Sequence, residues 1–188
     1  MNNPFCLILS GPSGSGKSTT AKKLWQTIDG NPAYLSLDSI KHIIRGARSN
    51  DYFLDLARES ALLLTENYLR LGHPTIVDKA FGSYRYVKPF VDLAKRLSLK
   101  SYYFKLNAPL NTLVERVEDR RKLSLEEKIQ RGEWPLPVGN IDTATRIYEF
   151  FEKNKHPEGI EIDTEKNSPD QVIGEILSRI KGNFETPS

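Results

Sequence analysis

The sequence predicts a three-layer α/β fold in which a five-stranded parallel sheet carries helices on both faces. Short apolar runs alternate along the chain with longer segments whose apolar residues recur at helical spacing. The first run, Phe5 to Leu9, is continuously apolar, as is typical of a strand buried on both faces of a parallel sheet. Such alternation forms βαβ units, and 188 residues suffice for one domain, expected to span residues 1–188.

Turn and cap residues divide the chain into these elements. The predicted strands are 5–9, 33–37, 75–78, 101–106 and 160–162. The predicted helices follow the first strand as far as residue 28, begin at Asp51, cover 83–98, 109–122 and 142–153, and close the chain from residue 169. Gly72 is expected to end the second long helix, and Ser168 with Gln171 forms a capping box for the last one.

Composition limits the classes of protein that the chain can be. The charged fraction of 27% and the hydrophobic fraction of 38% are those of a globular protein, and no apolar run approaches the ~20 residues that span a membrane. The single cysteine, Cys6, lies in the first apolar run and is expected to be a buried hydrophobe. We therefore expect a cytoplasmic protein without a membrane partner, and the net charge of +3 does not by itself indicate nucleic acid.

A glycine-rich run follows the first strand and precedes a helix. Its letters, GPSGSGKS, have the spacing Gly-x-x-x-x-Gly-Lys-Ser that forms a phosphate-binding loop in this context. Glycines let the backbone amides point inward at an anion, the lysine contacts the β- and γ-phosphates, and the serine hydroxyl is a magnesium ligand. The nucleoside triphosphate, expected to be ATP, should contact Gly11, Pro12, Ser13, Gly14, Ser15, Gly16, Lys17, Ser18 and Thr19.

Two other classes of nucleotide-binding protein fit the sequence less well. A guanine-specific switch should carry Asn-Lys-x-Asp, and the nearest string, residues 154–157, lacks the aspartate. A hydrolytic motor usually places a glutamate directly after the aspartate that ends the third strand, whereas Asp78 is followed by Lys79. A regulatory ATPase without an acceptor remains the alternative from another class.

The chain resembles the small P-loop kinases over about residues 5–122, in particular polynucleotide 5′-kinase domains, zeta-toxin-like kinases and chloramphenicol phosphotransferase. The strongest part of this resemblance is LILSGPSGSGKST, followed by YLSLDSI, by PTIVDKAF with the helix after it, and by LNAPLNTLVERVEDR. The resemblance implies a P-loop NTPase fold with a helical lid, expected at about 115–140. It also implies transfer of the γ-phosphoryl group of ATP to an alcohol.

The resemblance also assigns roles to four residues outside the loop. Asp38 matches the general base, and its alternative role is the N-cap of a helix that begins at Ser39. Asp78 matches the third-strand acid, which either holds magnesium together with Ser18, orients the acceptor, or is a buried structural carboxylate. Arg116 and Arg120 match the arginines that clamp phosphates. Because they are four residues apart they share one helix face, and surface pairing with Glu115 or Asp119 is their alternative.

The acceptor remains open at this stage. Many relatives have Ala-Thr-Asn after the third-strand aspartate, whereas this chain has Lys79-Ala80-Phe81, and Val87 stands where an arginine is expected. These departures favour a small molecule, namely a nucleoside, a sugar or an antibiotic-like compound, over a polynucleotide 5′-hydroxyl. Trp134, after the expected lid, is a candidate for stacking on a ring, although hydrophobic docking of its loop is the stronger expectation. The oligomeric state is not predicted.

Overall fold

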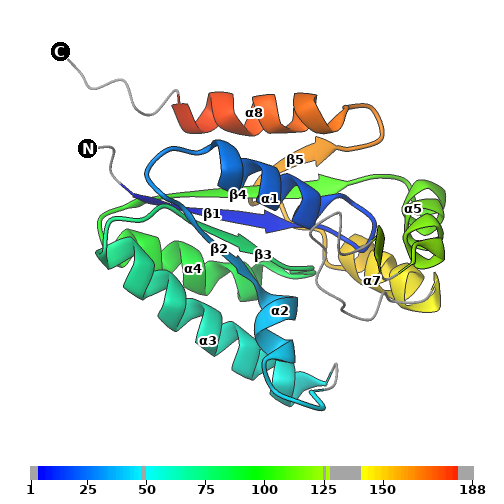
Figure 1. The fold of residues 1–188 in the computed structure, drawn as a ribbon, viewed down its shortest axis with the longest axis horizontal. Coiled ribbons are helices and arrows are strands. Elements are labelled where there is room, and N and C mark those ends of the chain that lie inside the picture. Colours follow the sequence, from blue (N-terminus) through cyan, green and yellow to red (C-terminus); the bar gives the residue numbers. More distant parts are fainter. Residues whose placement is uncertain (1–3, 48–49, 125, 128–140, 182–188) are drawn as a thin grey trace.

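The computed structural model describes residues 4–47, 50–124, 126–127 and 141–181. Its centre is a sheet of five parallel strands in the order β2-β3-β1-β4-β5 (Figure 1). The strands are β1 (Phe5–Ser10), β2 (Ala33–Ser36), β3 (Thr75–Asp78), β4 (Lys100–Asn107) and β5 (Ile160–Asp163). The predicted five-stranded parallel α/β fold is therefore confirmed.

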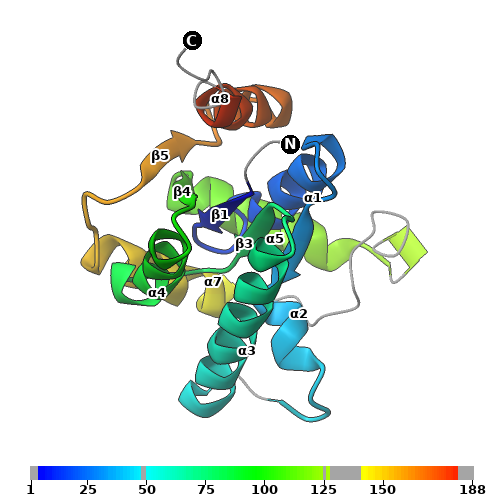
Figure 2. The same ribbon diagram turned by 90° about the vertical axis from the view of Figure 1, so that its left-hand side faces the viewer.

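The helices cover both faces of this sheet. They are α1 (Lys17–Thr27), α2 (Leu37–His42), α3 (Asp51–Arg70), α4 (Tyr84–Arg96), α5 (Leu110–Lys122), α7 (Ile141–Lys153) and α8 (Pro169–Lys181). Figure 2 shows α1 and α8 on one side of the sheet, with α3 and α4 on the other. Successive strand residues point to opposite faces of the sheet, where they contribute to two hydrophobic cores. In β1, Leu7 and Leu9 pack toward α1 and α8, while Cys6 and Ile8 pack toward α3 and α4.

Three strands end at the same level of the sheet, and this brings the expected site residues together. Asp78 at the end of β3 is in register with Leu9 of β1 on one side and with Ser36 of β2 on the other. The glycine-rich loop begins directly after the end of β1, and Asp38 lies two residues after the end of β2. The carboxyl edge of a parallel sheet is where α/β proteins bind their ligands.

One local expectation about Asp38 was wrong. The second strand was predicted to run to residue 37 with Asp38 as a possible helix N-cap, but β2 ends at Ser36 and α2 begins at Leu37. The N-cap is Ser36, whose Oγ accepts a hydrogen bond from the amide of Ser39 at 3.5 Å. A serine at this position takes the capping role, and Asp38 instead lies in the first turn of the helix.

The N-terminal cap of α8 agrees with the sequence. The amide of Gln171 donates to Ser168 Oγ at 3.3 Å, and the amide of Ser168 donates to Gln171 Oε1 at 2.8 Å, which is the predicted capping box.

Among the described helices, none combines the length and the apolar character needed to cross a membrane. Most of the expected lid, including Trp134, lies outside the described residues, so the lid stays a prediction.

Candidate active site

The loop between β1 and α1 is packed too tightly for side chains at two of its glycines. Gly11 has φ +151°, and a Cβ atom on it would overlap the carbonyl oxygen of Leu106 in β4. Gly14 has φ +83°, and a Cβ atom there would lie 2.6 Å from the carbonyl oxygen of Leu113 in α5. The spacing of glycines therefore lets the loop wrap closely against β4 and α5.

Lys17 folds back over this loop. Its ammonium group donates a hydrogen bond of 2.9 Å to the carbonyl oxygen of Pro12. Burial lowers the pKa of Lys17 to about 8, although the negative charges of Asp78 and Asp38 oppose that change. Both aspartates thus lie within electrostatic range of the lysine that the sequence assigns to the phosphates.

Asp78 is a buried carboxylate held by a tyrosine. Its side chain is almost fully buried, and the hydroxyl of Tyr34, on the neighbouring strand β2, donates to Asp78 Oδ2 at 2.5 Å. Burial raises the pKa of Asp78 above its usual value, whereas hydrogen bonds from Tyr34 and Ser18 lower it. A carboxylate beside a serine hydroxyl provides the hard oxygen ligands that magnesium prefers, so these two residues fit that ion.

Asp38 lies in the first turn of α2 within a group of lysines. Its Oδ1 atom forms an ion pair with Lys79 at hydrogen-bonding distance and a longer one, 3.7 Å, with Lys41. Burial alone would raise the pKa of this carboxyl, but Lys79 first, and then Lys41 and Lys17, bring it below its usual range. Asp38 is consequently ionised at neutral pH while its side chain remains 43% exposed.

The two arginines of α5 differ in their surroundings. Arg116 donates to the hydroxyl and the carbonyl of Thr164, at 3.0 and 2.8 Å, and to the carbonyl of Gly14 at 3.4 Å. These bonds join α5 to the segment after β5 and to the phosphate loop, rather than to the neighbouring acids considered as the alternative. The charge of Arg120 lowers the pKa of Lys17, so this arginine lies within electrostatic range of the loop. The phosphate-clamping role of both residues stays a prediction.

The departures after β3 have structural explanations. Phe81 is 2% exposed and packs with its ring centroid 5.8 Å from that of Phe90, and Val87 is fully buried in the same core. Arg85 and Arg58 lie against the ring of Tyr86, with their guanidinium carbons 4.4 and 4.1 Å from its centroid. The apolar replacements in this segment therefore fill the core on the α3 and α4 side of the sheet.

Sequence reasoning missed three residues that the structure brings to the site. Lys79 was noted only as a departure, Lys41 was not considered, and Tyr34 was counted only as part of a strand. A lysine directly after a strand-ending aspartate was the one signal that pointed to this pairing. The partner of Lys79 lies 41 residues away in the chain, so the sequence alone did not identify it.

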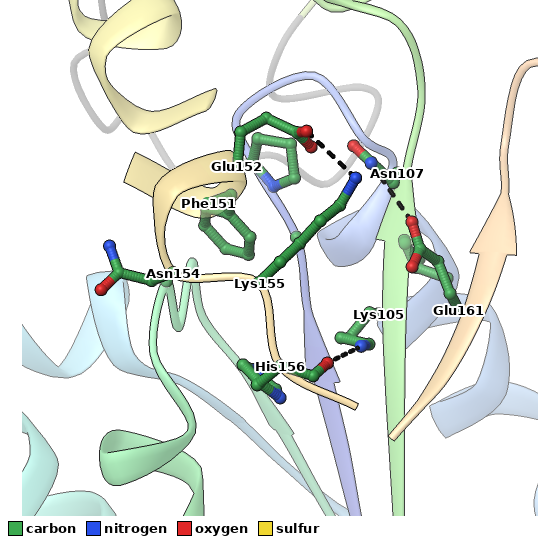
Figure 3. A pocket seen from close by; sticks show the side chains of 12 residues that line it. Lys105, Asn107, Phe151, Glu152, Asn154, Lys155, His156 and Glu161 are labelled. Atoms are coloured by element: carbon green, nitrogen blue, oxygen red, sulfur yellow. Dashed lines mark hydrogen bonds and ion pairs between the residues drawn. The ribbon is translucent and has the colours of Figure 1, made fainter. Parts of the chain in front are cut away.

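A hollow lies beside the phosphate loop, between β4, β5 and the end of α7 (Figure 3). Gly11 and Pro12 form one wall, and Figure 3 shows the end of α7 forming another. Its lysines are engaged, because Lys105 donates to the carbonyl of His156 at 2.8 Å and Lys155 pairs with Glu152 at 3.0 Å. In the sheet, β1 and β3 lie between this hollow and β2, the strand that leads to Asp38.

The fold and the phosphate loop define a P-loop NTPase with a kinase-like architecture. The sequence family described as an AAA domain matches residues 7–132, which is about two thirds of the chain, and the chain belongs to this family. No curated protein matches the sequence significantly. The resemblance to small P-loop kinases drawn from the sequence is therefore confirmed at the level of family and fold.

Solved structures with this fold include several kinases. The APS kinase CysC of Mycobacterium tuberculosis, solved with AMPPNP and APS, has a TM-score of 0.65 at 18% identity, covering 96% of this chain and 99% of that one. A sugar kinase from Janibacter has a TM-score of 0.62 at 16% identity, covering 96% and 95%. A chain of the Pnkp1/Rnl/Hen1 RNA repair complex has a TM-score of 0.60 at 19% identity, covering 83% of this chain and 47% of that one.

Proposed function

We propose that this protein is an ATP- and magnesium-dependent phosphotransferase that moves the γ-phosphoryl group to an alcohol of a small molecule. The observation that carries the proposal is the arrangement of three strand ends, which brings the phosphate loop and the ionised Asp38 to one edge of the sheet. A loop for the phosphates next to a carboxylate for the acceptor is the minimum set that a kinase needs.

Each residue of the site has a distinct task in this reaction. Lys17 leaves the carbonyl of Pro12 and contacts the β- and γ-phosphates. Asp38 accepts the proton of the acceptor hydroxyl while the oxygen of that hydroxyl forms a bond to the γ-phosphorus and the bond to ADP breaks. Arg120 stabilises negative charge on the transferred group, and Arg116 holds the loop in shape. Ser18 and Asp78 would hold magnesium, which supplies further charge neutralisation when bound.

The charges around Asp38 favour an uncharged acceptor. Lys79 and Lys41 are directed at Asp38 Oδ1, so their charges are already used within the protein. An acceptor with a phosphate group would have to compete with Asp38 for them. We therefore infer that a nucleoside, a sugar or an antibiotic-like alcohol is the substrate class.

A polynucleotide 5′-hydroxyl is the second candidate acceptor. It is favoured by Arg58 and Arg85, two cations that lie against Tyr86 in the first turn of α4, shortly after the end of β3. Arginine side chains contact the backbone phosphates of oligonucleotides in nucleic-acid-binding proteins. The two candidates differ in the number of charges on the acceptor, which an experiment can separate.

The test is a screen with γ-labelled ATP and magnesium against nucleosides, sugars, aminoglycoside- and amphenicol-type alcohols, and 5′-hydroxyl oligonucleotides. Labelling of an alcohol by the wild-type protein, and its loss in Asp38→Asn with Mg-ATP binding retained, is the expected result. General base catalysis typically contributes about 10²- to 10⁴-fold, so kcat should fall by that factor. Release of phosphate with no labelled acceptor would indicate a regulatory ATPase instead.

The proposal includes a cytoplasmic location, with which the buried thiol of Cys6 agrees.

A further inference from the structure

The ion pair between Lys79 and Asp38 joins the end of β3 to the start of α2. Lys79 is the first residue after β3, and Asp38 lies in the first turn of α2. Both described ion pairs of Asp38 are made by Oδ1, and Oδ2 takes part in neither. A carboxylate held at one oxygen presents the other in a defined direction.

We propose that Lys79 is a positioning residue that holds Asp38 in the orientation needed to accept the proton of the acceptor. This inference rests on the proposed function, because it concerns the base of that reaction. Lys79 neither donates nor receives the transferred proton. The proton moves from the acceptor hydroxyl to Asp38 Oδ2, and Lys79 stays on Oδ1 throughout.

Lys79 is suited to this task because its own backbone is fixed. Its amide donates to the carbonyl of Leu9 in β1 at 3.2 Å, and its carbonyl accepts from the amide of Phe81 at 2.8 Å. Phe81 is itself buried in the core, and the Lys79 side chain is only 17% exposed. The ammonium group is therefore anchored to the central sheet, where the phosphate loop also begins.

Lys41 cannot do the same. It lies three residues after Asp38 on the same short helix, and its Nζ atom is 3.7 Å from Asp38 Oδ1. A residue on α2 moves together with Asp38, so it cannot set the position of the carboxylate relative to the sheet. The exposed carboxylate would otherwise sample several rotamers, of which only some direct an oxygen at the acceptor.

The alternative role for Lys79 is direct binding of the acceptor. In that case its loss would weaken acceptor binding and would act independently of Asp38. In the positioning role its loss lowers the rate of chemistry and has no further effect once Asp38 can no longer accept a proton. A double-mutant cycle separates these two cases.

The experiment measures kcat and the acceptor KM for the wild type, Lys79→Met, Lys79→Arg, Asp38→Asn and the double variant Lys79→Met with Asp38→Asn, on the best acceptor from the screen. Lys88→Met is the matched control, since Lys88 also pairs with an aspartate, Asp92 at 2.5 Å, but on the exposed face of α4. Thermal unfolding and the shift produced by Mg-ATP establish that each variant folds and binds nucleotide.

We expect Lys79→Met to lower kcat by about 10- to 100-fold with an acceptor KM within twofold, because misplacement of a reacting group by about 1 Å costs up to 10²-fold. Lys79→Arg should recover most of the rate, Lys88→Met should match the wild type, and Lys79→Met should cost less than about threefold in the Asp38→Asn background. A rise in KM at unchanged kcat, or an equal loss in both backgrounds, overturns the positioning role while leaving phosphotransfer intact. Absence of transfer by the wild type to every acceptor overturns the proposed function and this inference with it.

Discussion

The hydroxyl of Tyr34 on β2 and the carboxylate of Asp78 on β3 are joined by a hydrogen bond of 2.5 Å at the carboxyl edge of the sheet. Asp78 is buried with its pKa raised, and Tyr34 is one of two hydroxyl groups that limit this rise. A residue on an outer strand thus supports the acid that the kinase resemblance assigns to magnesium or to the acceptor.

Tyr34→Phe should therefore destabilise the protein, and more so at pH 7 than at pH 4. Loss of a hydrogen bond to a buried charged group costs about 1–3 kcal/mol. The pKa of Asp78 is raised in the folded protein, so the protonated form is buried at little cost at low pH, whereas the ionised form opposes folding at higher pH. The hydrogen bond from Tyr34 stabilises the ionised form, so its loss matters more at pH 7. Urea unfolding at the two pH values measures this, with the exposed Tyr52→Phe as control. An equal loss at both values would mean that the hydroxyl of Tyr34 does not distinguish the ionised from the protonated form of Asp78.

Mg-ATP affinity should decrease as the pH rises through about 8. Lys17 has its pKa lowered to about 8 by burial, so above this pH the nucleotide-free protein increasingly carries a neutral lysine. Bound phosphates favour the charged form, and binding should then take up a proton, which calorimetry in two buffers of different ionisation enthalpy detects. Lys17→Arg keeps its charge throughout and should show no such pH dependence. Lys17→Ala should lose the thermal stabilisation by Mg-ATP.

Substitutions of the two arginines of α5 should have different effects. Arg116→Ala removes three hydrogen bonds between segments, so the Tm of the nucleotide-free protein should fall by several degrees. Arg120→Ala should change Tm less and should lower kcat more than it raises the KM for ATP, because its contact strengthens in the transition state. Steady-state kinetics and thermal unfolding of both variants check this. If Arg116→Ala leaves Tm unchanged, its bonds to Thr164 do not stabilise the fold.

The salt dependence of the acceptor KM should be weak. A neutral small molecule makes no ionic contact, so we expect a change of less than about twofold between 50 and 200 mM salt. An oligonucleotide with six or more phosphate contacts would lose about 10³-fold over the same range. Arg85→Gln removes an exposed cation beside Tyr86, and it should then leave the acceptor KM unchanged. A steep loss of acceptor affinity with rising salt, made shallower by Arg85→Gln, would instead favour a polynucleotide acceptor.

Local patterns predicted the parts of the molecule that depend on neighbouring residues. The continuous apolar run at Phe5 to Leu9 became the central strand, and the capping box at Ser168 formed as expected. The order of the strands and the pair of Lys79 with Asp38 depend on contacts between distant segments, which periodicity does not report. The N-cap of α2 was misplaced because Ser36, Asp38 and Ser39 are all good capping residues and only the backbone decides among them.

The bonds of Arg116 restrict where motion can begin. Its guanidinium ties the middle of α5 to the phosphate loop at Gly14 and to the segment after β5 at Thr164, and the carbonyl of Leu113 closes directly over Gly14. This half of α5 is thereby part of the rigid frame of the molecule. We predict that, if a lid of the kind implied by the kinase resemblance closes over bound nucleotide, it pivots beyond residue 116, with Arg120 on the moving side and Arg116 on the fixed side.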